Sequence, residues 1–137
     1  MSALPPNDQQ PRGRRVVPAS LALGILFGLF VLGAQPFAVK LIPSPWDQLA
    51  HVAVFAALAC ALGLLSGQRG IRMLLFAVTG ASFVGALDEW HQMFLPGRHA
   101  GWDDLAMDAI GSLLGAALLA VARQRATRGA NAHLASN

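Results

Sequence analysis

Four long runs of apolar residues restrict what this chain can fold into. No charged residue occurs between Arg15 and Lys40. Residues 16–37 can therefore cross a hydrocarbon core about 30 Å thick as a helix that rises about 1.5 Å per residue. Further runs cover residues 49–67, 73–87 and 105–122, the last interrupted only by Asp108. Because short segments with Pro or Gly separate the runs, the sequence predicts an all-α membrane protein, a four-transmembrane-helix bundle.

Composition excludes the other common classes of protein. The 137 residues are 55% hydrophobic and 12% charged, whereas soluble domains carry about 25% charged residues. That balance also excludes disorder, and the single cysteine, Cys60, excludes an intrachain disulfide framework. The net charge is +3, but the basic residues form short clusters beside the apolar runs. They are therefore interpreted as membrane flanks, and no nucleic-acid partner is expected.

The distribution of Lys and Arg predicts the orientation, because cytoplasmic loops carry the excess. One side of the membrane receives Arg12, Arg14, Arg15, Arg69, Arg72, Arg123, Arg125 and Arg128. The other side receives only Lys40 and Arg98. Both termini are therefore expected to be cytoplasmic.

Three regions are predicted: a disordered basic N-terminal tail over residues 1–15, a membrane domain over 16–122 and a basic C-terminal tail over 123–137. A cleaved signal peptide is the alternative for the first run. That run exceeds the usual apolar length of about 7 to 15 residues, and cleavage after Ala34 would place Leu32 where a small residue is needed. A membrane-spanning helix is therefore expected.

The acidic residues gather on the opposite side of the membrane from the basic clusters. Every Asp or Glu except Asp8 lies at the extracytoplasmic end of a predicted span: Asp47, Asp88, Glu89, Asp103, Asp104 and Asp108. The same layer contains Arg98, Gln92, His51, His91 and His99. Nearly all the polar chemistry of an apolar chain is thus expected on one face of the membrane.

Spacing predicts that three helices each contribute a polar pair, because residues four apart share a helix face. The pairs are Asp47 with His51, Asp88 with Gln92, and Asp104 with Asp108. Small residues continue the same faces into the membrane: Ala81 and Gly85 before Asp88, and Gly111 and Gly115 after Asp108. Small residues allow helices to approach closely. The polar pairs are therefore expected to point toward one another.

Structural explanations compete with functional ones at these positions. Asp47 and Asp104 suit helix N-termini whatever the function. Asp88 and Glu89 occupy a helix C-terminus, where negative charge is unfavourable, so a partner such as Arg98, His51 or a cation is expected. Asp108 lies deeper in its span and should face the bundle interior. The residues Trp46, Trp90 and Trp102 fit an interfacial aromatic belt, and Cys60 fits packing.

The order of these motifs resembles the VanZ-like family of small bacterial integral membrane proteins. The resemblance covers roughly residues 46–118 and depends most on the block from Leu87 to Gln92, followed by Pro96-Gly97-Arg98 and the Asp104-x-x-x-Asp108 repeat. This chain departs from the family at two positions. The family often has Lys where this chain has Gln48, and it usually has Asn where this chain has Asp108.

The resemblance implies a multi-pass protein of the bacterial inner (cytoplasmic) membrane. The founding member of the family gives low-level resistance to the glycopeptide antibiotic teicoplanin, but the resemblance supplies no reaction. Membership alone does not imply that a chain confers resistance.

The leading hypothesis is a polar site that binds or processes a lipid-linked or anionic component of the cell envelope, such as a lipid-linked cell-wall precursor. Its candidate residues, with unassigned catalytic or binding roles, are Asp47, His51, Asp88, Glu89, Gln92, Arg98, Asp104 and Asp108. A divalent cation, Mg²⁺, Ca²⁺ or Mn²⁺ more than Zn²⁺, would suit this oxygen-rich set. Enzymatic activity stays open, since no nucleophile or phosphate-loop motif occurs.

Two other functions compete with this hypothesis. Intramembrane acids and a histidine can relay protons or bind ions, which would suit a small transporter. However, the ionisable residues stop near one boundary and suggest no continuous path. In the third interpretation, the polar residues only stabilise the bundle or dock a partner protein.

Overall fold

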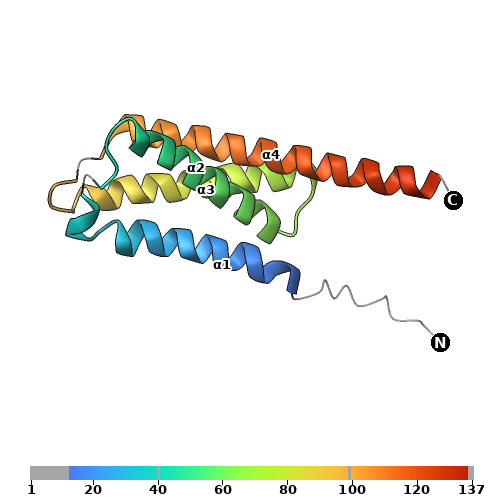
Figure 1. Ribbon diagram of the computed structural model, residues 1–137, viewed down its shortest axis with the longest axis horizontal. Coiled ribbons are helices and arrows are strands. Elements are labelled where there is room, and N and C mark those ends of the chain that lie inside the picture. The colour runs from blue at the N-terminus through green and yellow to red at the C-terminus, as the bar shows by residue number, and fades with distance from the viewer. Residues whose placement is uncertain (1–12, 40, 99, 136–137) are drawn as a thin grey trace.

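The described part of the chain forms four α-helices and contains no β-strand. The computed structural model describes residues 13–39, 41–98 and 100–135. The helices are α1 (Gly13–Phe27), α2 (Trp46–Leu65), α3 (Gly70–Gln92) and α4 (Trp102–Ala135) (Figure 1). A π-helical turn, η1 (Gly28–Leu32), extends α1, and a 3₁₀ turn, η2 (Pro36–Ala38), follows. The predicted all-α class is confirmed.

All four helices are long and apolar enough to cross a membrane. Their outer surfaces expose many large apolar side chains, such as Leu23, Phe83 and Leu113, each more than half exposed. Contiguous apolar surface of this kind fits lipid better than water. Trp46, Trp90 and Trp102 are also exposed, near the ends of their helices. The chain is therefore a multi-pass membrane protein whose surface suits a lipid bilayer.

The helices differ from the predicted apolar runs mainly at their ends. The first run was expected to reach residue 37, but the continuous helix ends at Leu32 and only the short turn η2 follows. Pro36 has no N–H and its ring crowds the carbonyl of the preceding turn, which disfavours continuation of the helix there. At the third run the difference is reversed, because α3 continues past Leu87 through the acidic residues to Gln92. An apolar run therefore indicates the membrane-buried part of a helix, but not where the helix ends.

The predicted tails differ in how much of each the structure describes. Residues 1–12 of the predicted N-terminal tail lie outside the described residues, and α1 begins at Gly13, inside that predicted tail. The predicted basic C-terminal tail is helical as far as Ala135, because α4 continues through it without a break. Its described side chains from Gln124 to Leu134 are exposed.

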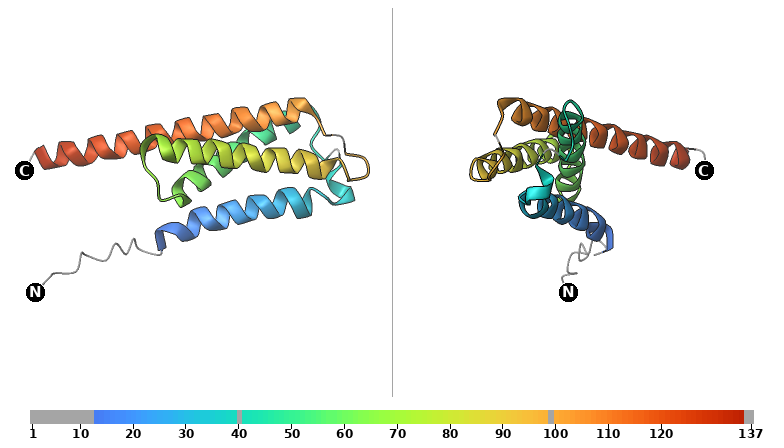
Figure 2. Two further views of the ribbon diagram at one scale, coloured as in Figure 1. Left: turned by 180° about the vertical axis from the view of Figure 1, so that it is seen from behind. Right: turned by 60° about the vertical axis from the view of Figure 1, so that its left-hand side comes forward.

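The helices form one elongated bundle in which α4 and α1 lie on opposite sides (Figures 1 and 2). Helix α2 packs against α4, α3 and α1, and α3 also packs against α4. The start of α1, the α2–α3 connection and the C-terminal part of α4 share one end of the bundle, as Figure 1 shows. The segments that lead into α2 and α4 share the other end. That second end carries the acidic residues.

The interior is packed with small side chains. Phe55 and Leu58 are the largest fully buried apolar residues, and most of the other buried apolar residues are alanines, including Ala59, Ala77 and Ala81. Gly111 and Gly115 of α4 lie directly on the backbone of α2, at Val52 and Ala56. A Cβ atom added at either glycine would collide with a backbone carbonyl oxygen. The predicted close approach along the small-residue face of α4 is confirmed.

Candidate functional site at the ends of helices α2, α3 and α4

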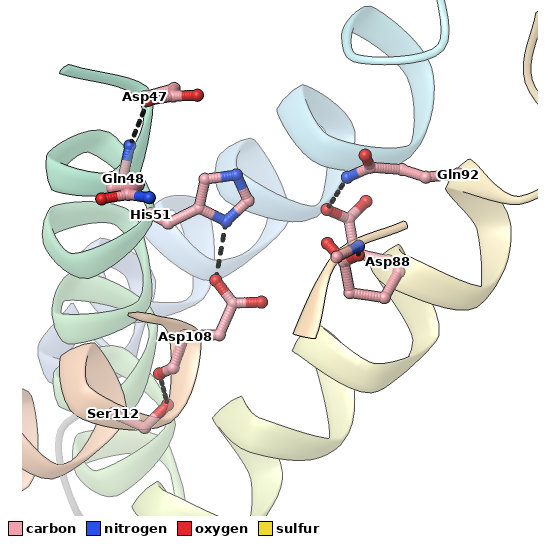
Figure 3. Close-up of polar contacts among 9 residues, drawn as sticks. Asp47, Gln48, His51, Asp88, Gln92, Asp108 and Ser112 are labelled. Atoms are coloured by element: carbon pink, nitrogen blue, oxygen red, sulfur yellow. Dashed lines mark hydrogen bonds and ion pairs between the residues drawn. The ribbon is translucent and has the colours of Figure 1, made fainter. Parts of the chain in front are cut away.

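A buried ion pair joins α2 to α4 at the centre of the site. His51 Nδ1 lies 2.7 Å from Asp108 Oδ1 (Figure 3). The Asp108 side chain is fully buried, whereas that of His51 is 20% exposed. No other ion pair occurs among the described residues. The ring of Phe55 stacks on His51 one turn deeper, with centroids 6.3 Å apart.

Asp108 fits between three helices because α3 offers no side chain opposite it. Gly85 lies against the carboxylate, and a Cβ atom at that position would come within 2.7 Å of Asp108 Oδ2. On its own helix, the hydroxyl of Ser112 donates to the carbonyl of Asp108 at 2.7 Å. The expected orientation of Asp108 toward the bundle interior is therefore confirmed.

Helix α3 contributes a second buried pair. Gln92 Nε2 donates to Asp88 Oδ2 at 2.9 Å, as the spacing of four residues allows (Figure 3). Both side chains are buried. Asp88 also interacts electrostatically with His51, so the pair on α3 and the pair between α2 and α4 belong to one polar cluster.

Glu89 connects the end of α3 to the start of α4. Its Oε2 accepts a hydrogen bond of 2.7 Å from the backbone N–H of Gly101, the residue before α4. The side chain is 7% exposed. Arg98, His51 or a cation was expected as a partner of Asp88 and Glu89. The hydrogen bonds described come instead from an amide side chain and a backbone N–H, while Asp88 interacts electrostatically with His51 and Arg98.

Arg98 stabilises a loop instead of pairing with a carboxylate. Its Nη2 donates to the carbonyls of Gly33 at 2.9 Å and Ala38 at 3.2 Å, both in the segment between α1 and α2. An Arg98 pair with Asp103 or Asp104 does not occur among the described residues. The guanidinium thus joins the α3–α4 connection to the α1–α2 connection, at the same end of the bundle as the His51–Asp108 and Asp88–Gln92 pairs.

Asp47 and Asp104 lie at the rim of the cluster. Both are half-buried, and Asp47 Oδ1 accepts from the N–H of Gln48 at 2.9 Å near the start of α2. His51 therefore pairs with Asp108 and not with Asp47, its expected neighbour on the same helix. Asp104 interacts electrostatically with His51 from the first turn of α4.

Four buried polar atoms in this layer have no hydrogen-bond partner among the described residues: Glu89 Oε1, His91 Nδ1, Arg98 Nε and Asp108 Oδ2. The His91 ring packs near Phe30, with centroids 5.5 Å apart. His99 lies outside the described residues. A buried polar group without a partner costs about 1 to 3 kcal/mol. The layer therefore retains unused hydrogen-bonding capacity.

The described residues provide no set of side chains that could bind the expected divalent cation. No three His, Cys, Asp or Glu side chains of the described residues are arranged to hold a metal ion. The carboxylates instead accept hydrogen bonds from His51, Gln92 and the Gly101 N–H.

Sequence reasoning missed several members of the site. Gly33 and Ala38 contribute carbonyl oxygens, and Gly101 contributes an N–H. Backbone groups have no signature in residue type. Ser112 could have been found, because it follows Asp108 by one helical turn on the small-residue face.

Comparison with known proteins agrees with the geometry. A sequence model of the VanZ/LLP1 family matches residues 9–123, which include all four membrane-spanning segments up to Arg123 and every residue of the polar cluster. No curated protein and no solved structure gives a significant match. The chain belongs to the VanZ/LLP1 family.

Proposed function

We propose that this protein binds the polar head of a lipid-linked envelope component at the extracytoplasmic surface of the bacterial inner membrane. The observation that carries the proposal is the fully buried Asp108, which pairs with His51 across two helices and whose Oδ2 has no partner among the described residues. An ionisable group inside a membrane domain costs about 2.5 to 3.5 kcal/mol at a helix centre, so it typically marks a functional site.

The chemistry of the cluster favours a ligand rich in hydrogen-bond donors. Carboxylates supply most of its polar atoms, and ionised carboxylates only accept hydrogen bonds. The hydroxyl and ammonium groups of a saccharide or peptide attached to a lipid carrier would match them. The buried Nε of Arg98 adds one donor suited to an anionic group of the same ligand. The bilayer would present such a head at this depth.

Binding and processing differ in what they require of His51. Binding requires only the donors and acceptors already in place. Processing would also require a proton to move, and the His51–Asp108 pair has the arrangement in which a carboxylate orients a histidine for that task. A contribution to teicoplanin resistance would follow if the bound component were a cell-wall precursor.

Ion transport receives less support from the same residues. Among the described residues, the buried polar side chains end at Ser112, one turn below Asp108. Deeper in the bundle, the buried side chains of the described core are apolar, such as Leu58, Ala77 and Ala116. A proton or ion path would have to continue through this region.

The test is lipid analysis of the gently purified, full-length protein by mass spectrometry. We expect a polyprenyl-linked saccharide to co-purify with the wild type and to fall about tenfold or more in Asp88→Asn and Glu89→Gln, because hydrogen bonds to charged groups contribute about 1.5 to 3 kcal/mol each. Asp103→Asn is the matched control, since Asp103 is an exposed carboxylate of the same layer.

Thermal unfolding of each variant separates a site from a structural role. A binding site predicts variants that keep their stability and lose the lipid. Loss of lipid in proportion to loss of stability would instead indicate that the polar residues only hold the bundle together. Full retention of the lipid in both variants would exclude the proposed site.

A further inference from the structure

A basic hollow lies at the end of the bundle opposite the acidic site, between the start of α3 and the later part of α4. Its volume is about 700 Å³, within the range of about 300 to 1,000 Å³ typical of small-molecule sites. Its lining comes from Arg69, just before α3, from Gly70 at the start of α3, and from Arg123, Gln124, Thr127 and Arg128 of α4.

The hollow is positively charged and contains no acidic residue. Three guanidinium groups line it, and no Asp or Glu does. None of the three is paired with a carboxylate among the described residues, where the His51–Asp108 pair is the sole ion pair. The first turn of α3 also has no side-chain cap and no acidic residue, so its N–H groups add positive partial charge beside Gly70.

The depth of the hollow matches the head-group layer of a bilayer. Trp102, at the start of α4, is exposed near the opposite boundary. Arg123 follows it by twenty-one helical residues, a rise of about 32 Å, which is close to the hydrocarbon thickness of about 30 Å. The buried Met73 and the half-buried Leu74 line the hollow beside the arginines. The hollow thus combines apolar side chains, which suit the acyl chains of a phospholipid, with cationic side chains, which suit its anionic head group.

We propose that this hollow binds an anionic phospholipid of the leaflet on that side, with its phosphodiester held by Arg69, Arg123 and Arg128. Guanidinium groups match phosphate oxygens in bidentate geometry, and basic pockets between membrane helices suit anionic head groups. The Lys and Arg count predicts that this leaflet is the cytoplasmic one. The inference is independent of the function proposed for the acidic site.

Native mass spectrometry of the full-length protein in detergent tests the proposal, with phosphatidylglycerol and phosphatidylcholine of identical acyl chains as probes. We expect the wild type to bind phosphatidylglycerol about tenfold more tightly. Arg123→Gln and Arg69→Gln should each weaken that binding about fivefold, the equivalent of about 1 kcal/mol for one basic residue near an anionic lipid. Arg128→Gln gives a second variant on α4 if Arg123→Gln does not fold.

Matched controls come from neighbouring arginines that do not line the hollow. Arg125 lies near Arg123 on α4, and Arg72 lies near Arg69 at the start of α3. Arg125→Gln and Arg72→Gln remove the same charge and should change the affinity less than twofold. Equal losses in all four variants would overturn the proposal in favour of general attraction by the basic end. Equal binding of the two lipids, or displacement of phosphatidylglycerol by equimolar inorganic phosphate, would overturn it too.

Discussion

At the scale of single residues, the buried pair of His51 and Asp108 organises the acidic end of the bundle. Neither residue alone distinguishes a functional group from a satisfied core residue. Their contact supports the proposed site, because it joins two helices and, among the described residues, leaves one carboxylate oxygen unused against Gly85. The family usually has Asn in place of Asp108, as the sequence resemblance implies. Asn would keep an acceptor for His51 but would remove the charge.

A double-mutant cycle on this pair should show that the two residues are coupled. We expect His51→Leu and Asp108→Ala each to lower the free energy of unfolding by about 1 to 3 kcal/mol, since each leaves a buried polar group without its partner. The double variant should lose less than the sum, because no unpaired group remains. Thermal unfolding in detergent can be followed by dye labelling of Cys60, the sole cysteine, which is half-buried.

Asp103→Asn serves as the control for the cycle, because this carboxylate is exposed and is expected to change the stability by less than about 0.5 kcal/mol. Additive losses for His51 and Asp108 would contradict the coupling.

At the scale of helices, the sequence predicted which residues lie in the polar layer, but not which of them pair across helices. Spacing of four residues placed Asp88 beside Gln92, which is confirmed, since a local pattern determines that contact. The same reasoning favoured Asp47 as the neighbour of His51, whereas the partner is Asp108, fifty-seven positions away. Which helix faces which depends on the packing of the whole bundle, and spacing within one helix carries no such information.

The hydropathy pattern also did not predict where the helices end or which groups the loops contact. Polar residues from Asp88 to Gln92 extend α3, since helical hydrogen bonds do not require apolar side chains. Arg98 binds carbonyl groups near η1 and η2, and a carbonyl is present at every position of a chain. The small-residue face of α4 was predictable, because Gly111 and Gly115 continue the helical spacing from Asp108.

The contact between α2 and α4 should be highly sensitive to a single added methyl group. In Gly115→Ala, the new Cβ would overlap the backbone of Ala56, so the two helices must separate. We expect a loss of about 1 to 3 kcal/mol from overpacking, measured by thermal unfolding. Gly24→Ala on α1 is the matched control, since nothing lies within 4 Å of its added Cβ. That variant should be neutral or more stable by up to about 1 kcal/mol. Equal stability of Gly115→Ala and the wild type would contradict the close packing.

At the scale of the whole molecule, polar groups are divided between the two ends. The acidic cluster occupies one end and the arginine-lined hollow the other, with an alanine-rich interior between them. Such a division gives the two ends of the protein distinct chemistry. It also makes the orientation in the membrane decisive for both proposals.

Reporter fusions test this orientation directly. We expect green fluorescent protein fused after Asn137 to fluoresce, because the excess of Lys and Arg predicts a cytoplasmic C-terminus. Alkaline phosphatase fused after Gly97, in the α3–α4 connection, should be active, since that connection is expected outside the cytosol. Phosphatase fused after Gln68, in the α2–α3 connection, is the control and should be inactive. The reverse pattern would place the acidic cluster in the cytosol and contradict the proposed function.

The glycine contacts between α2 and α4 also determine how the polar end can respond to a ligand. With Gly111 and Gly115 set against the backbone of Val52 and Ala56, lengthwise sliding of α4 would bring larger side chains onto the α2 carbonyls. A shift of one turn, about 5.4 Å, would also carry Asp108 out of reach of His51. The position of α4 along α2 is therefore fixed by these glycine contacts. If the proposed ligand enters the polar end, α3 and the loops are the parts that move to accept it, because the glycine contacts do not constrain them.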